Sequence, residues 1–409
     1  EEALRDYKKA IIFKPDYCDA YLQMGTLCLR FSNTTGAKKL FDRALTIRPN
    51  SAELYNKIGI AYHQIGLYVE SIELFYRSLK LEKNCKFDSY FNLGNSFSAI
   101  GEATEAIHYL NLAIKNNPTS AKAYNNLGFA FNAIAEVKKS KESYIRALNV
   151  EPTYSYACWN LHGNSKTLGE AKKIIKNCLE IDNSYLKAQL TLCILEAYEG
   201  DFSSYNNLLC SSYSEHPYTR SFRWVMSLPK LPKLYFNRWH FFDSLIKLTK
   251  TNRPFYEFGV WRGASFKYLI KRYKKGYGFD TFEGLPEKWN NEPKGKYSSF
   301  GKVPNITNGI FVKGDFTITL PKFFSKKRST ASLINFDADL YSSTLCALRF
   351  AKNIIDDKTI LIFDELIINE SWEQDEFRAL NEFCAENSFS YEVIAVSFYT
   401  KQVALKIRK

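Results

Sequence analysis

The chain has 409 residues, enough for two or three domains of ordinary size. A hydrophobic fraction of 45% and a charged fraction of 24% exclude a disordered or collagen-like chain. The formal net charge is +13, but no nucleic-acid-binding motif accompanies it, so we expect no nucleic-acid partner. We also expect no membrane span, because no apolar run approaches the ~20 residues that one requires.

The nine cysteines are scattered singly, without the C-x-x-C spacing of a zinc site. Their odd number argues against a complete disulfide framework. We therefore expect reduced, buried thiols and a cytoplasmic protein.

Internal repetition dominates residues 1–217. Glycine, each time after an apolar residue, recurs in phase, and proline or asparagine marks intervals of about 34 residues. The glycines are Gly25, Gly59, Gly94 and Gly128, and the markers are Pro15, Pro49, Asn84, Pro118, Pro152, Asn183 and Pro217. This pattern resembles the tetratricopeptide repeat. The resemblance implies an all-α superhelix of stacked helix pairs that binds a protein partner or associates with itself.

An asparagine recurs on the first helix of three successive repeats, at Asn92, Asn126 and Asn160. A primary amide both donates and accepts, so such a row could bind the backbone of an extended peptide. The alternative is that these amides only pack or are solvated.

The segment 218–236 contains Pro229 and Pro232 and is expected to be a linker. A helical pattern follows it over 238–249. The expected domains are therefore a repeat array over 1–217, the linker over 218–236, and a third region over 237–409.

From Pro254 onward, short apolar segments alternate with helical segments, near 264–275 and 344–356. This alternation predicts an α/β fold with a doubly wound, mostly parallel sheet that ends in an antiparallel hairpin. The expected strands are 255–260, 276–280, 310–313, 332–336, 359–363, 391–396 and 402–407.

Ligands of such sheets bind beyond the carboxyl ends of the strands. After the first strand, the glycine-rich segment 257–265 forms either a ligand-binding turn or only a tight turn. Asp280 ends the second strand, where a carboxylate can accept hydrogen bonds from a ribose. Asp315 and Phe316 follow the third strand, where an adenine could be flanked.

Four carboxylates follow the fourth and fifth strands, at Asp337, Asp339, Asp364 and Glu365. Each could singly be a helix cap or a surface residue. Together they would repel one another unless a cation neutralised them, and Mg²⁺ prefers such oxygen ligands.

Three segments, 257–265, 278–286 and 337–344, resemble the macrocin O-methyltransferase family of class I S-adenosylmethionine-dependent enzymes. The resemblance covers about 237–409 and implies a seven-stranded, Rossmann-like sheet. It further implies a sugar or glycan substrate, S-adenosylmethionine and Mg²⁺.

The resemblance also assigns roles to single residues. Glu257, Gly259 and Ser265 would hold the methionine part of the cofactor, and Asp280 its ribose. Gly263 would also belong to the cofactor-binding residues. The metal ligands would be Asp337, Asp364 and Glu365.

The implied reaction moves a methyl group from a sulfonium to a hydroxyl oxygen. No histidine follows His240, so Asp337 or Asp339 is the expected proton acceptor. Two alternatives remain open. The acceptor hydroxyl could be phenolic or belong to a lipid or peptide, or the protein could be a non-catalytic repeat adaptor with a cofactor-binding domain.

Overall fold

A computed structural model describes residues 2–82 and 86–409, so that Asn84 lies outside the described residues. The chain divides into two compact units, Glu1–Glu151 and Pro152–Lys409. This division differs from the expected boundary at 217, because the helices that follow residue 151 belong to the second unit.

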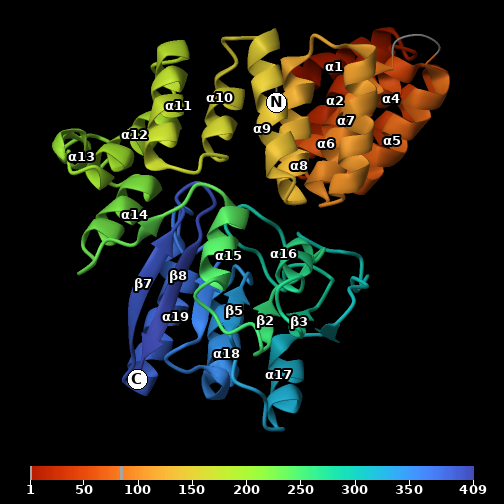
Figure 1. Ribbon diagram of the computed structural model, residues 1–409. Helices are drawn as coiled ribbons and strands as arrows, with labels where there is room; N and C mark the ends of the chain where they lie inside the picture. The colour runs from red at the N-terminus through yellow and green to blue at the C-terminus, as the bar shows by residue number, and fades with distance from the viewer. Residues whose placement is uncertain (1, 83–85) are drawn as a thin grey trace. The chain divides into compact units, whose positions relative to one another are not determined.

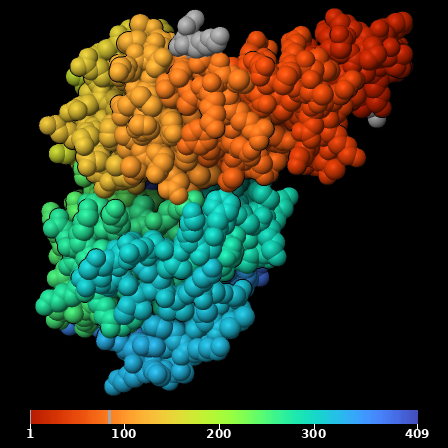
Figure 2. All heavy atoms as spheres, turned by 90° about the vertical axis from the view of Figure 1, so that its right-hand side faces the viewer, coloured from red at the N-terminus to blue at the C-terminus, as the bar shows by residue number. Residues whose placement is uncertain are grey.

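The described part of the first unit is helical (Figure 1). After α1, the helices form successive pairs, α2 with α3 through α8 with α9. Their bounds are α1 Glu2–Phe13, α2 Cys18–Arg30, α3 Thr34–Ile47, α4 Ala52–Gln64, α5 Tyr68–Leu81, α6 Phe87–Ala99, α7 Ala103–Asn116, α8 Ala121–Ala133 and α9 Val137–Val150. Within this unit the colours of Figure 2 follow one another in chain order, as expected when each repeat stacks on its neighbours in sequence.

The in-phase glycines allow the two helices of a pair to approach closely. A Cβ atom at Gly59 would lie 2.5 Å from the ring of Phe75, and one at Gly128 would lie 2.6 Å from the ring of Tyr144. Phe75 and Tyr144 are buried in the second helix of their pairs. The repeated glycine thus marks the point where a large side chain of the second helix packs against the backbone of the first. This side chain is aromatic at three of the four glycines and is Leu110 at Gly94.

The second unit combines helices with one sheet of eight strands. Its helices are α10 Ser155–His162, α11 Leu168–Ile181, α12 Leu186–Tyr198, α13 Ser203–Leu209, α14 Pro217–Met226, α15 Arg238–Ile246, α16 Ala264–Leu269, α17 Phe316–Phe324, α18 Tyr341–Ala351, α19 Glu376–Asn387, and the 3₁₀ helices η1 Lys352–Ile354 and η2 Trp372–Gln374. Its strands are β1 Lys233–Leu234, β2 Phe255–Phe258, β3 Gly276–Asp280, β4 Gly309–Lys313, β5 Leu333–Phe336, β6 Ile360–Phe363, β7 Ser390–Val396 and β8 Val403–Arg408.

The strand order is β1-β7-β8-β6-β5-β2-β3-β4. The five strands from β2 to β6 pair with one another in parallel. Strand β8 runs antiparallel to both β6 and β7. All seven expected strands are present, and the short β1, which pairs with the edge strand β7, makes eight instead of seven. The order of the parallel strands reverses between β2 and β5, which is where doubly wound sheets bind ligands.

Side chains of β2 alternate between the two faces of the sheet. Tyr256 and Phe258 point into the large core that contains residues of α17, α18 and α19. Phe255 lies on the other face, where its ring contacts Phe266 of α16 with centroids 4.7 Å apart. Glu257 shares that second face by alternation. The candidate site therefore lies on the face that α16 covers.

The expected linker over 218–236 contains α14 and β1 instead of extended chain. Phe222 and Val225 of α14 are fully buried in the same core as the sheet. The ring of Phe222 lies 4.7 Å from that of Phe398. Pro229 and Pro232 fall in the short stretch between α14 and β1. The prolines thus end one element without separating two domains.

A disulfide joins Cys158 of α10 to Cys178 of α11, with 5.5 Å between the Cα atoms. This pair differs from the expected set of reduced thiols. The two cysteines are 20 residues apart and meet only because α10 and α11 pack side by side.

Candidate functional site

The turn after β2 brings two loops of the sheet into direct contact. Gly259 has a φ of +88°, and a Cβ atom there would lie 1.8 Å from the carbonyl oxygen of Asp337, which follows β5. Gly263 has a φ of +74° and immediately precedes α16. Both positions require glycine, so the turn holds the ends of β2 and β5 together at the point where strand order reverses.

Glu257 is a fully buried carboxyl group at the centre of the sheet. Its Oε1 accepts hydrogen bonds from Ser265 Oγ and, over 3.2 Å, from Asn335 Nδ2. Its Oε2 is buried without a hydrogen-bond partner among the described residues. Burial raises the pKa of Glu257 to about 8, although both hydrogen bonds lower it. A buried acceptor without a donor fits a ligand that carries a donor, such as an ammonium group.

Asp280 organises the turns around it. Its Oδ2 accepts hydrogen bonds from the backbone amides of Val260 and Trp261, each over 2.7 Å, and its Oδ1 accepts one from Phe282 over 2.6 Å. A carboxylate has about four acceptor positions. One position thus remains for a ribose hydroxyl, and the residue also supports the glycine turn.

Asp315 and Phe316 have structural roles in α17. Asp315 is the N-cap residue of the helix. Its Oδ1 atom accepts hydrogen bonds from the amide and the hydroxyl of Thr317. The ring of Phe316 lies 5.9 Å from that of Phe258. The structure does not bring these two residues to the carboxylate of Glu257, which lies on the other face of the sheet.

Asp337 and Asp339 lie half-buried in the loop after β5. Burial raises the pKa of both carboxyl groups well above the ordinary value. The neighbouring charge of Asp364 adds to this rise at Asp337, and that of Glu365 adds to it at Asp339. A carboxylate with a raised pKa is a stronger proton acceptor than an ordinary carboxylate, which suits a general base.

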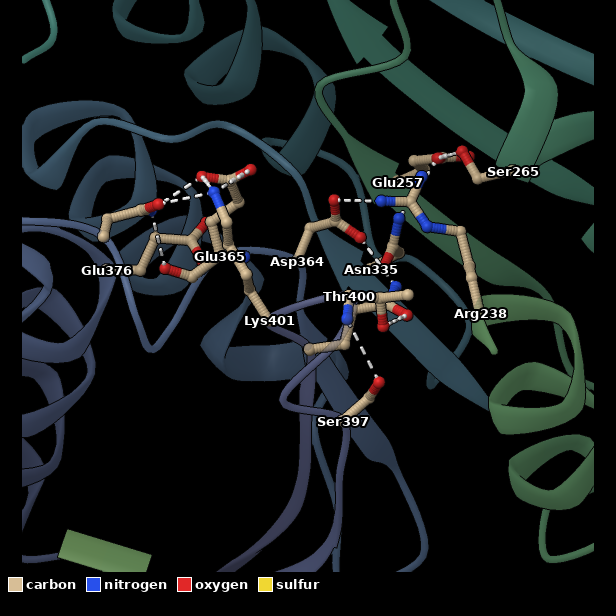
Figure 3. A network of polar contacts seen from close by, with 12 residues as sticks. Arg238, Glu257, Ser265, Asn335, Asp364, Glu365, Glu376, Ser397, Thr400 and Lys401 are labelled. Carbon is tan, nitrogen blue, oxygen red and sulfur yellow. Dashed lines mark hydrogen bonds and ion pairs between the residues drawn. The ribbon is translucent and has the colours of Figure 1, made fainter. Parts of the chain in front are cut away.

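Asp364 and Glu365 follow β6 and have separate basic partners (Figure 3). Arg238 donates a hydrogen bond to Asp364 over 2.5 Å, and Lys401 lies 3.3 Å from Glu365. Within residues 2–82 and 86–409, no three acidic, histidine or cysteine side chains are grouped so that they could hold a metal ion. Asp364 and Glu365 thus pair with basic side chains, and Mg²⁺ binding by Asp337, Asp364 and Glu365 stays a prediction.

Several residues of this region were not predicted from the sequence. Asn335 is the β5 register partner of Glu257, and a polar residue on that face of an apolar strand was a usable signal. Glu376 is fully buried at the start of α19, where its Oε2 accepts a hydrogen bond from the Glu365 amide over 3.3 Å. Burial raises the pKa of Glu376 well above the ordinary value. The sequence offered no comparable signal for Arg238, which is 126 residues from Asp364.

The amides of the asparagine row are hydrogen-bonded to other side chains of the protein. Asn92 Nδ2 donates to Asn56 Oδ1 over 2.8 Å, and Asn126 Nδ2 donates to Asn95 Oδ1 over 2.7 Å. In the second unit, Asn160 accepts a hydrogen bond from the hydroxyl of Tyr399 over 3.3 Å. Asn92 and Asn126 thus join neighbouring helices, and all three amides have partners within the protein, which favours the packing alternative.

Comparison with known proteins identifies the repeats. The tetratricopeptide repeat family matches residues 52–85 and 87–120. The first unit carries tetratricopeptide repeats. MamA is 28% identical, covers 40% of this chain and 97% of its own, and has a TM-score of 0.36. PilF of Pseudomonas aeruginosa is 19% identical. The match covers 50% of this chain and 96% of PilF, with a TM-score of 0.41.

Curated relatives match only short stretches. Human protein O-mannosyl-transferase TMTC3 is 30% identical over 103 residues, which is 25% of this chain and 11% of that protein. Mouse TMTC3 is 34% identical over 65 residues, or 16% of this chain and 7% of that protein. The chain thus spans about a tenth of the length of these relatives.

No helix among residues 2–82 and 86–409 is long and apolar enough to cross a bilayer. The tetratricopeptide repeats point to protein partners, because stacked repeats form extended binding surfaces.

Proposed function

We propose that the second unit is an S-adenosylmethionine-dependent O-methyltransferase that acts on a sugar or glycan hydroxyl. The tetratricopeptide repeats would bind a protein partner. The observation that carries the proposal is Glu257 Oε2, a buried acceptor without a partner among the described residues, at the point where strand order reverses. The sugar substrate rests on the resemblance of residues 237–409 to the macrocin O-methyltransferases.

The residues present fit the methyl donor. Glu257 would accept hydrogen bonds from its ammonium group, with Ser265 and Asn335 fixing the carboxylate. Asp280 would use its remaining acceptor position for a ribose hydroxyl. The loop contact at Gly259 keeps both carboxylates in place, because no larger residue fits there.

S-adenosylmethionine, when bound, supplies a methyl group on a positively charged sulfur. Asp337 or Asp339 would take the proton from the attacking hydroxyl, since burial gives both a raised pKa. The domain would accelerate the reaction chiefly by holding the two partners in contact and in line. No step is assigned to Mg²⁺, because Asp364 and Glu365 already have basic partners.

The test is incubation of the full chain with isotope-labelled S-adenosylmethionine and a set of free sugars and glycans, followed by mass spectrometry. We expect one labelled methyl group on a sugar oxygen, and its loss in Asp337→Asn or Asp339→Asn. Label on a phenolic, lipid or peptide hydroxyl would replace the sugar substrate, and cofactor binding without transfer would favour the adaptor function.

A further inference from the structure

Two consecutive carboxylates at the end of β6 each have a basic partner from a distant part of the second unit. Arg238, the first residue of α15, places Nη2 2.5 Å from Asp364 Oδ2. Lys401, which precedes β8, places Nζ 3.3 Å from both carboxylate oxygens of Glu365. Figure 3 shows the two carboxylates directed toward these different partners.

Neutral amides occupy further acceptor positions of the same carboxylates. Gln402 Nε2 donates to Asp364 Oδ1 over 2.6 Å, and Asn369 Nδ2 donates to Glu365 Oε2 over 2.6 Å. Asn369 Oδ1 also accepts a hydrogen bond from Lys401 over 2.6 Å. Each carboxylate therefore has one cation and one amide, and a metal ion would compete with both for the carboxylate oxygens.

The residue that precedes Arg238 is also fixed in place. Asn237, which caps α15, is fully buried, and its Nδ2 donates to Gly163 O over 3.2 Å and to Asn164 Oδ1 over 3.1 Å. Asp364 is only 5% exposed. Breaking a buried pair by removing its cation leaves an uncompensated charge, which is strongly unfavourable.

We propose that Arg238 and Lys401 are the resident counter-cations of the acid cluster, in the place where the sequence predicts Mg²⁺. The second unit then works without a divalent metal at this cluster.

Titration of the full chain with Mn²⁺ alone, followed by calorimetry and electron paramagnetic resonance, tests this proposal. We expect no stoichiometric binding to the wild-type chain. Binding of one Mn²⁺ per chain that is lost in Asp364→Asn would overturn the proposal. No methyl donor or acceptor is present, so this result is independent of the proposed methyl transfer.

Removing the cations gives the complementary test. The double variant Arg238→Met with Lys401→Met frees both carboxylates, and we expect it to bind Mn²⁺ at least tenfold more tightly than the wild-type chain. Arg220→Met is the matched control, because Arg220 pairs with Glu373 outside the cluster. Absence of binding by a folded double variant would contradict the proposal. If the double variant does not fold, the milder pair Arg238→Gln with Lys401→Gln, which also removes both charges, must show the tighter binding.

Discussion

Glu257 of β2 and Asn335 of β5 are register partners at the centre of the sheet, and Asn335 Nδ2 lies 3.2 Å from Glu257 Oε1. Both side chains are fully buried, and the other residues of β2 and β5 are aliphatic or aromatic. Burying two polar groups costs free energy unless they are paired. The pair leaves Glu257 Oε2 free to accept a ligand's hydrogen bond.

Cofactor affinity should depend on pH through Glu257. Its pKa of about 8 means that the carboxyl group is protonated near neutral pH, whereas an ammonium ligand requires the carboxylate. The affinity for S-adenosylhomocysteine should therefore rise up to tenfold per pH unit from pH 6 to 8 and level off above. Calorimetry in buffers of different ionisation heats should detect proton release. A flat profile would remove Glu257 from the site, and Glu257→Gln is the control that should abolish the slope.

The same shift affects stability. The folded protein binds a proton at Glu257 more tightly than the unfolded chain, so this group's contribution to the free energy of unfolding falls as pH rises from about 4.5 to 8. Glu257→Gln should remove this decline. Denaturant unfolding of both proteins at several pH values measures it, and equal slopes would contradict the raised pKa.

Replacing Asp280 should affect both binding and folding. Asp280→Ala removes the acceptor of three backbone amides, and unsatisfied buried groups cost about 1–3 kcal/mol each. We expect a reduced free energy of unfolding and a more than tenfold loss of S-adenosylhomocysteine affinity. Asp315→Asn is the control, because asparagine also caps helices. Unchanged affinity in folded Asp280→Ala would exclude the ribose contact.

The repeat glycines should be intolerant of a methyl group. In Gly59→Ala the new Cβ would lie 2.5 Å from the ring of Phe75, and overpacking of this kind costs about 1–3 kcal/mol. Gly169→Ala in α11 is the matched substitution, because no atom lies within 4 Å of its Cβ position. Thermal melts should show a lower transition only for Gly59→Ala. Equal melts would contradict the close helix contact.

A fragment of residues 152–409 should fold, whereas a fragment that begins at Leu234 should not. The shorter fragment lacks Leu190, Ile194, Phe222 and Val225, which are buried in the same core as the sheet. Circular dichroism and thermal melts of both fragments distinguish the two boundaries. Cooperative melting of the shorter fragment would restore the boundary near 237 that the sequence predicts.

The sequence predicts the helices and strands of this chain better than it predicts which of them pack together. Runs such as Ile360–Phe363 mark buried strands locally, and Gly59 with Phe75 marks a helix pair within one repeat. The assignment of α10 to α14 to the second unit depends on contacts such as Asn237 with Gly163, which are 74 residues apart. Arg238 is 126 residues from Asp364, and Lys401 is 36 residues from Glu365. Neither pair is visible in the local sequence, so the expectation of a metal ion depended on repulsion among the acids alone.

The central claim is that the second unit binds the methyl donor at Glu257 and Asp280. Calorimetric titration of the full chain with S-adenosylhomocysteine, with and without EDTA, tests it most directly. We predict one site per chain, equal affinity in both conditions, and more than tenfold weaker binding in Glu257→Gln. No binding by the folded wild-type chain, or equal binding by the wild-type chain and Glu257→Gln, would contradict the account.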